Sequence, residues 1–377
     1  MNALEKNQKY FMAVTVAIVT VGLIMVLSAS YMFSKETFGT PTHFFFKQLI
    51  YILVGGLVAF SISKTKMGFW YRNIYLFNGA AISILLLTMT PLGLSIKGSQ
   101  RWLSLAGFSF QPGEIVKYSV CLTAIFYFNH YYKYSIKERL LNSLHFLIPL
   151  VLLLIQPDFG TFTISAILIA FACFLSDFPR KYFWSLLVSG IFAGGALLVA
   201  APYRVRRLLV FLDPWSDPQN SGFQIIQSYL AFANGHIFGQ GIGNSNEKLF
   251  YLPEAHNDFI LSVIGEELGF IGIFAVVLLF LSFTFFGFKL SLFPRSRVNK
   301  QIIACFVFAI SMQTCLNMGV VLGLLPTKGL NLPFVSSGGT SLIANLVAIG
   351  IIFASLSEKS QVLTDDTEDL FTQKVIS

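Results

Sequence analysis

Carboxylate and ammonium side chains stand at the ends of several long apolar stretches of this chain. Asp258 opens one stretch, Glu114 and Lys117 open a second, and Asp158 lies between two more. Ionisable groups inside or beside a membrane span are costly and by default mark a functional site. A positioned carboxylate is also a common general base. These four residues are therefore the first candidates for chemistry.

Asp258 is followed at helical spacing by small residues, Ser262, Gly265 and Gly269. Because these residues share one face, they predict either a cavity or a close contact with another helix. An alternative is that Asp258 only caps its helix. His256 has no second histidine, cysteine or carboxylate at metal-ligand spacing, so we expect no structural zinc site.

Glu114 and Lys117 are three residues apart near the start of a predicted helix, so they can form an ion pair. They are then either a self-neutralised structural pair or part of a substrate site. Two deeper carboxylates, Glu266 and Glu267, are expected to pair with neighbouring helices.

Arg204, Arg206 and Arg207 precede an apolar run at residues 208–212, a pattern typical of an interfacial segment. The cluster either binds an anionic headgroup of the substrate or anchors its loop to anionic phospholipid. Lys328 lies in a second loop, residues 325–341, which is rich in Gly, Ser and Thr. That loop either presents backbone N–H groups to an anion or is simply a re-entrant turn.

The composition requires that lipid surrounds these residues. Apolar and aromatic residues make up 55% of the 377, charged residues only 12%, and the mean hydropathy is +0.70. A soluble domain carries about 25% charged residues. The net charge of +8 fits cytoplasmic anchoring of a membrane protein, and no nucleic-acid partner is expected.

We predict an all-α polytopic membrane protein, with residues 1–377 forming a single membrane domain of about ten transmembrane helices. The expected spans are 11–31, 48–63, 74–90, 113–129, 142–155, 160–176, 182–201, 258–287, 301–324 and 341–357. Residues 202–257, between spans seven and eight, form a long extracytoplasmic loop, and residues 358–377 form an acidic cytoplasmic tail. Segments on the side of the termini hold 16 Lys and Arg against nine opposite, which places both termini in the cytoplasm.

All of the candidate groups then lie in the outer half of the molecule. Cations beside carboxylates at an outer membrane surface suit an amphiphilic substrate with a phosphate headgroup. That arrangement allows either an enzyme or a lipid transporter.

The chain resembles the shape, elongation, division and sporulation (SEDS) family. The motifs that carry the resemblance are FQPGE at 110–114, QPDFGT at 156–161, GQGIGN at 239–244, YLPEAHNDF at 251–259, GEELG at 265–269 and the loop 325–341. Ala255 and Lys328 are typical of the division branch rather than the elongation branch, while Asn257 and Ser337 depart from the family pattern.

The resemblance implies a peptidoglycan glycosyltransferase of the inner, cytoplasmic membrane that polymerises lipid II at its outer face during cell division. It also implies a class B penicillin-binding protein transpeptidase as partner, beside other division-complex proteins. A lipid II transporter, a non-catalytic division scaffold and the elongation polymerase are the alternatives.

In such a reaction the acceptor 4-hydroxyl attacks C1 of the donor sugar, and undecaprenyl diphosphate leaves. Asp258 is the expected base, and transfer from an α donor to a β product inverts C1. Lys or Arg, or a divalent cation such as Mg²⁺ or Mn²⁺, must stabilise the departing diphosphate. The expected substrate-binding residues are Glu114, Lys117, Asp158, Arg204, Arg206, Arg207 and Lys328.

Overall fold

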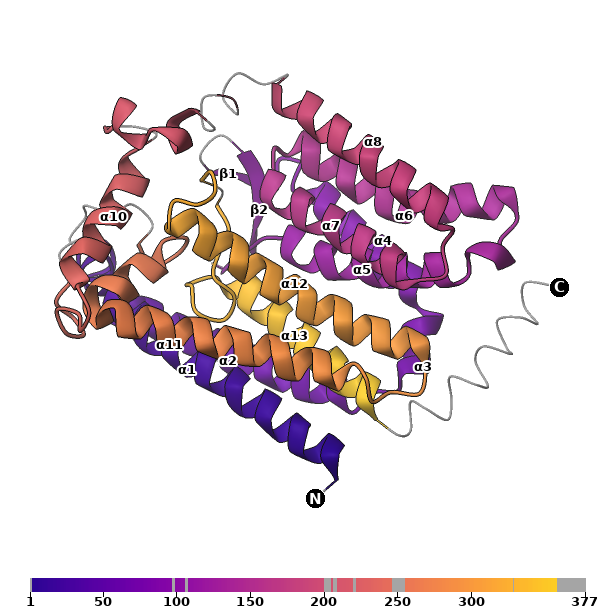
Figure 1. Ribbon diagram of the computed structural model, residues 1–377, viewed down its shortest axis with the longest axis horizontal. Helices are drawn as coiled ribbons and strands as arrows, with labels where there is room; N and C mark the ends of the chain where they lie inside the picture. Colours follow the sequence, from indigo (N-terminus) through magenta and orange to yellow (C-terminus); the bar gives the residue numbers. More distant parts are fainter. Residues whose placement is uncertain are drawn as a thin grey trace.

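The computed structural model describes residues 2–96, 99–105, 108–199, 205, 209–219, 222–245, 255–327 and 329–357. The fold is mostly helical, and each of the ten predicted apolar stretches coincides with a helix (Figure 1). These helices are α1 (Ala3–Phe38), α2 (His43–Ser63), α4 (Ile74–Leu87), α5 (Gly113–Asn129), α6 (Ile136–Ile155), α7 (Phe159–Leu175), α8 (Arg180–Val199), α11 (Ile260–Leu290), α12 (Arg297–Val321) and α13 (Gly339–Leu356).

Six of the described helices are long and apolar enough to cross a membrane: α1, α2, α6, α11, α12 and α13. Helices α4 and α7 are apolar but shorter. The outward faces carry large apolar side chains, such as Leu57 of α2, which is 68% exposed. An exposed apolar surface of this extent requires lipid around it. The chain is a multi-pass membrane protein, and the number of ten crossings stays a prediction.

A small antiparallel sheet corrects the expectation of a purely helical fold. Strands β1 (Gly93–Ile96), β2 (Ser99–Leu105) and β3 (Phe108–Phe110) lie in the order β1-β2-β3. Residues Leu94 and Trp102 are paired in β1 and β2, and Leu103 and Phe110 in β2 and β3. In Figure 1 the sheet lies at the end of the bundle away from the first turns of α1.

Helices α12 and α13 form the centre of the bundle. Helix α13 packs on α2, and α12 contacts α5, α7, α11 and α13. Figure 1 shows the two central helices, in yellow and orange, between a layer of α1, α2 and α11 and a layer of α4 to α8. Most of the apolar stretch of α13 is buried, whereas that of α2 is mostly exposed, because α2 faces lipid. The polar side chains of Gln313 and Asn317 on α12 are therefore held inside the protein.

Short helices complete the described chain: α3 (Met67–Arg72), η1 (Tyr131–Lys133), η2 (Pro214–Ser216) and α10 (Phe223–Gly235). Two of them, η2 and α10, lie within residues 202–257, which were expected to be a loop. Helix α10 packs against α11, so part of this segment belongs to the folded core.

Candidate functional site

Asp258 lies in a turn directly before α11, and it is half-buried. Phe259 occupies the cap position of α11 and makes no side-chain cap hydrogen bond. The main-chain carbonyl of Asp258 accepts a hydrogen bond from Asn317 Nδ2 at 2.8 Å. A Cβ placed on Gly329 would lie 3.2 Å from Asp258 Oδ2, so the carboxylate faces the backbone of the loop at residues 325–341. The carboxylate is thus held on a fixed backbone at the surface of that loop.

The small residues that follow Asp258 make a close helix contact with α10. Ser262 Oγ lies 2.7 Å from Ser228 Oγ, and a Cβ on Gly235 would lie only 1.9 Å from the carbonyl oxygen of Gly265. Of the two alternatives for this face, the structure therefore has the close helix contact. The contact fixes the start of α11, and with it Asp258.

The expected pairing of the deeper glutamates with neighbouring helices is confirmed for Glu267, whereas Glu266 pairs with the non-helical segment after α10. Ser28 Oγ of α1 lies 2.6 and 2.7 Å from the two carboxylate oxygens of Glu267. Ser245 Oγ donates to Glu266. Both carboxylates are fully buried, and these bonds tie α1 and the segment after α10 to α11.

Glu114 and Lys117 form the expected pair on α5. Lys117 Nζ donates to Glu114 Oε2 at 2.6 Å and to Gln313 Oε1 of α12 at 2.7 Å. The ammonium also lies 5.1 Å from the ring centroid of Tyr118. Lys117 is 1% exposed, so its ammonium group is held inside the protein.

Asp158 is the N-cap of α7 and is buried. Its carboxylate accepts from Thr161 N at 3.2 Å, from Thr161 Oγ1 at 2.9 Å and from Gln111 Nε2 at 3.2 Å. Arg101 Nη1 of β2 lies 3.9 Å away. Asp158 therefore joins α7, the start of α5 and the sheet.

Two amides on α12 connect these groups. Gln313 and Asn317 are one helical turn apart and share a face. Gln313 Nε2 donates to the carbonyl of Asn331 at 3.0 Å, and Asn317 Nδ2 donates to that of Leu330 at 2.6 Å. On this face Gln313 contacts Lys117, and Asn317 contacts the backbone of Asp258. Both amides also contact the loop at residues 325–341.

The loop at residues 325–341 folds back into the protein, as its re-entrant alternative predicted. Leu332, Phe334 and Val335 are buried, and a Cβ on Gly22 of α1 would lie 2.4 Å from the carbonyl oxygen of Phe334. Ser336 Oγ donates to the carbonyl of Asn257 at 2.6 Å, beside Asp258. The loop thus lies directly beside Asp258.

Four predicted substrate-binding residues, Arg204, Arg206, Arg207 and Lys328, lie outside the described residues, as do residues 358–377. Within the described part of the chain, no three His, Cys, Asp or Glu side chains gather in a way that could hold a metal ion.

The sequence reasoning missed four polar residues of the site: Arg101, Gln111, Gln313 and Asn317. The two amides on α12 carried a signal, because an i, i+4 pair of polar side chains inside an apolar span marks a buried face. Arg101 carried none, because the sheet that positions it was not expected.

Known proteins are similar to this chain in sequence and in fold. The profile of the FtsW, RodA and SpoVE cell cycle proteins matches residues 8–361. The "Probable peptidoglycan glycosyltransferase FtsW" of Buchnera aphidicola subsp. Schizaphis graminum is 40% identical over 340 residues, which are 87% of this chain and 95% of that protein. The protein of the same name from Legionella pneumophila is 36% identical over 356 residues, 91% of this chain and 89% of that one.

Two solved structures are similar in fold. A chain from a study of how a peptidoglycan synthase complex coordinates polymerization and crosslinking superimposes with a TM-score of 0.73 at 28% identity, over 93% of this chain and 98% of that one. The rod shape determining protein RodA of Thermus thermophilus gives a TM-score of 0.68 at 22% identity, over 93% and 97% of the two chains.

Proposed function

We infer the function from the family to which this chain belongs, the FtsW/RodA/SpoVE cell cycle proteins. The chain is a peptidoglycan glycosyltransferase that polymerises lipid II at the outer face of the inner membrane during division. Relatives that are 36% and 40% identical carry the name of this activity, with the division protein FtsW. The observation that carries the proposal is the half-buried carboxylate of Asp258 beside the loop at residues 325–341.

Asp258 is the general base of this reaction. It accepts the proton of the acceptor hydroxyl as the hydroxyl oxygen forms its bond to C1 of the donor sugar. The bond from C1 to the diphosphate oxygen breaks in the same step, so C1 is inverted and no covalent sugar–enzyme intermediate forms. The bonds from Asn317 to the carbonyls of Asp258 and Leu330 support this role, because they fix the base against its loop.

The departing diphosphate needs positive charge. Lys117 is proposed to supply a buried positive charge, and Arg204, Arg206, Arg207 and Lys328 are the proposed headgroup contacts. Mg²⁺ is usually bound by one or two carboxylates together with substrate phosphates, and the carboxylate of Asp258 would supply one such ligand. A bound Mg²⁺ or Mn²⁺ would supply additional charge at the leaving oxygens.

A class B penicillin-binding protein is the proposed partner, with other division proteins around the pair. The similarity to a chain of a peptidoglycan synthase complex supports this assignment. The excess of Lys and Arg on the side of the termini supports both termini being cytoplasmic.

The decisive experiment substitutes Asp258→Asn in the purified protein, supplied with lipid II and the partner. We expect polymerisation to fall by at least about 10²-fold while the variant keeps its thermal stability and its partner. Asp213→Asn is the matched control, because Asp213 is an exposed carboxylate of the same outer segment. Near-normal glycan synthesis by Asp258→Asn would remove it from the base role. Lipid II transport without any glycan from the wild-type protein would favour the transporter, and neither activity would favour a scaffold.

The arginine cluster is tested separately. Arg204→Gln, Arg206→Gln and Arg207→Gln together should weaken lipid II binding in neutral detergent, where no anionic bilayer exists. Arg295→Gln, an exposed arginine between α11 and α12, is the control. Unchanged affinity in detergent, with activity lost only in anionic liposomes, would mean that the cluster is a membrane anchor.

A further inference from the structure

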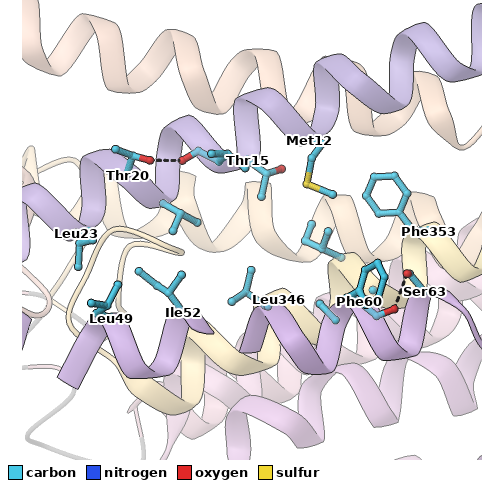
Figure 2. A pocket seen from close by; sticks show the side chains of 16 residues that line it. Met12, Thr15, Thr20, Leu23, Leu49, Ile52, Phe60, Ser63, Leu346 and Phe353 are labelled. Atoms are coloured by element: carbon cyan, nitrogen blue, oxygen red, sulfur yellow. Dashed lines mark hydrogen bonds between the residues drawn. The ribbon is translucent and has the colours of Figure 1, made fainter. Parts of the chain in front are cut away.

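A cavity of about 530 Å³ lies between α1, α2 and α13. Figure 2 shows α1 above it and α2 below, with Leu23 and Leu49 at one end and Met12, Phe60 and Ser63 at the other. Its volume is within the range of about 300–1,000 Å³ that is typical of small-molecule sites.

The wall of the cavity is apolar, although three hydroxyl groups line it. Thr15 donates to the carbonyl of Phe11 at 2.8 Å, Thr20 to that of Val16 at 2.9 Å and Ser63 to that of Phe60 at 2.7 Å. Each hydroxyl is therefore satisfied within its own helix. The cavity offers dispersion contacts and no polar group that would select a polar ligand.

The cavity has the depth of one membrane leaflet. The residues of α1 that line it run from Met12 to Leu23, which is roughly 16 Å along a helix. Half of a hydrocarbon core of about 30 Å is nearly the same length. Val16 and Phe60, which border the cavity, are 54% and 63% exposed, so the cavity opens sideways to lipid between α1 and α2.

A cation lies at one end of this cavity. Lys64 directly follows Ser63, and its Nζ lies 5.1 Å from the ring centroid of Phe60. Lys66 follows on the same loop and is exposed. Lysines at this depth attract anionic headgroups.

We propose that this cavity binds one acyl chain of an anionic phospholipid, whose phosphate group is held at Lys64. The ligand is a lipid of the leaflet on the side of the N-terminus, and it fills the space between α1 and α2. The site is separate from the proposed polymerase site, because Asp258, Lys117 and the loop at residues 325–341 do not line the cavity.

Gly56 provides the means to close the cavity. It lines the cavity, and a Cβ built on it would meet no atom within 4 Å. Gly56→Phe and the smaller Gly56→Leu should therefore occupy the acyl site without disturbing the helix packing. Gly79→Phe is the matched control, because Gly79 of α4 also has open space at its Cβ and does not line the cavity.

The measurement is native mass spectrometry of the purified chain in neutral detergent with equal amounts of phosphatidylglycerol and phosphatidylcholine. We expect the wild-type protein and Gly79→Phe to retain phosphatidylglycerol over phosphatidylcholine by about fivefold. Both Gly56 variants should lose the bound lipid while their thermal stability is kept. Equal lipid retention by Gly56→Phe, Gly56→Leu and the wild-type protein would overturn the proposal. So would a wild-type dimer that becomes monomeric only in the Gly56 variants, because a second copy of the chain would then fill the cavity.

The headgroup contact has its own test, which does not depend on filling the cavity. Lys64→Gln should bring the two lipids to near parity. Lys289→Gln is the control, because Lys289 lies 5.8 Å from the ring centroid of Phe285 at the end of α11, away from the cavity. A preference for phosphatidylglycerol that is unchanged by Lys64→Gln, or lost equally with Lys289→Gln, would show that Lys64 does not hold the phosphate.

Discussion

At the residue scale, Gln313 is the side chain on which the buried charges and the loop of the site both depend. Its Oε1 accepts from Lys117 and its Nε2 donates to the carbonyl of Asn331. Because both ends of one amide are used, the position of Lys117 and the position of the loop are coupled. A buried group that loses its partner costs about 1–3 kcal/mol.

Gln313→Leu should therefore lower both stability and activity. The substitution leaves the Lys117 ammonium with one partner fewer and the Asn331 carbonyl without its donor, so we expect unfolding to cost about 1–3 kcal/mol less. Thr314→Val is the control, because the Thr314 hydroxyl bonds only to Ile310 of its own helix. Thermal unfolding in detergent and glycan synthesis are the measurements. Equal behaviour of the two variants would show that Gln313 does not couple the groups.

Exchange of the charges of Glu114 and Lys117 separates a structural pair from a functional one. We expect the double variant Glu114→Lys, Lys117→Glu to fold yet make no glycan, because the ammonium would leave Gln313 and its place in the site. The reference is the thermal stability of each single variant, Glu114→Lys and Lys117→Glu, which we expect to be lowered. Restored polymerisation in the double variant would mean that the pair has only a structural role.

At the element scale, α11 is broken in its first half, at Gly269. Gly269 has φ 67° and ψ −164°, a conformation that is essentially restricted to glycine. The chain after α10 fills the break: Gln240 N donates to the carbonyl of Glu266, and Phe270 N donates to that of His236, at 2.9 and 3.0 Å. The break thus joins α11 to the segment that follows α10.

Gly269→Ala should destabilise the protein. Backbone strain alone would cost about 1–3 kcal/mol, and steric clashes of the new methyl group should add to that cost. An added Cβ would lie 2.4 Å from Gly239 N and 2.5 Å from the carbonyl oxygen of Ile237. Gly79→Ala in α4 is the control, and it should be neutral or slightly stabilising, because its helix has room for the methyl group. Thermal unfolding of the two variants decides the matter, and a Gly269→Ala protein as stable as Gly79→Ala would contradict it.

The sequence predicted long elements better than short ones. Spans such as 113–129 and 258–287 agree with α5 and α11 to within about three residues, because apolar length is itself the signal. The strands at 93–110 and helix α10 were missed, since neither contains a run of membrane length. Asp258 and the Glu114–Lys117 pair were found because charges are rare in spans. Neutral amides such as Gln313 are more common there, so the only signal for Gln313 was its spacing of four residues from Asn317.

At the scale of the whole molecule, the candidate groups belong to one end of the bundle. Asp258 directly precedes α11, and Asp158 precedes α7 and lies 3.9 Å from Arg101 of the sheet. In Figure 1 the sheet lies at the end of the bundle away from the first turns of α1. A polymerase that uses lipid-linked precursors at the outer face needs this end outside the cell. The orientation of the bundle is therefore a direct condition of the proposed function.

Cysteine labelling in intact cells tests that orientation. In a Cys315→Ser background, whose other cysteines are buried, we expect Trp215→Cys to react with a membrane-impermeant maleimide. Tyr132→Cys, between α5 and α6, should react only after permeabilisation, because the 16 Lys and Arg on its side of the membrane favour the cytoplasm. Both positions are well exposed, so a difference in labelling reports the side of the membrane rather than burial. The Cys315→Ser parent should stay unlabelled. If only Tyr132→Cys were labelled in intact cells, the orientation would be the opposite of the one expected. Asp258 would then lie on the cytoplasmic side, and polymerisation at the outer face would be excluded.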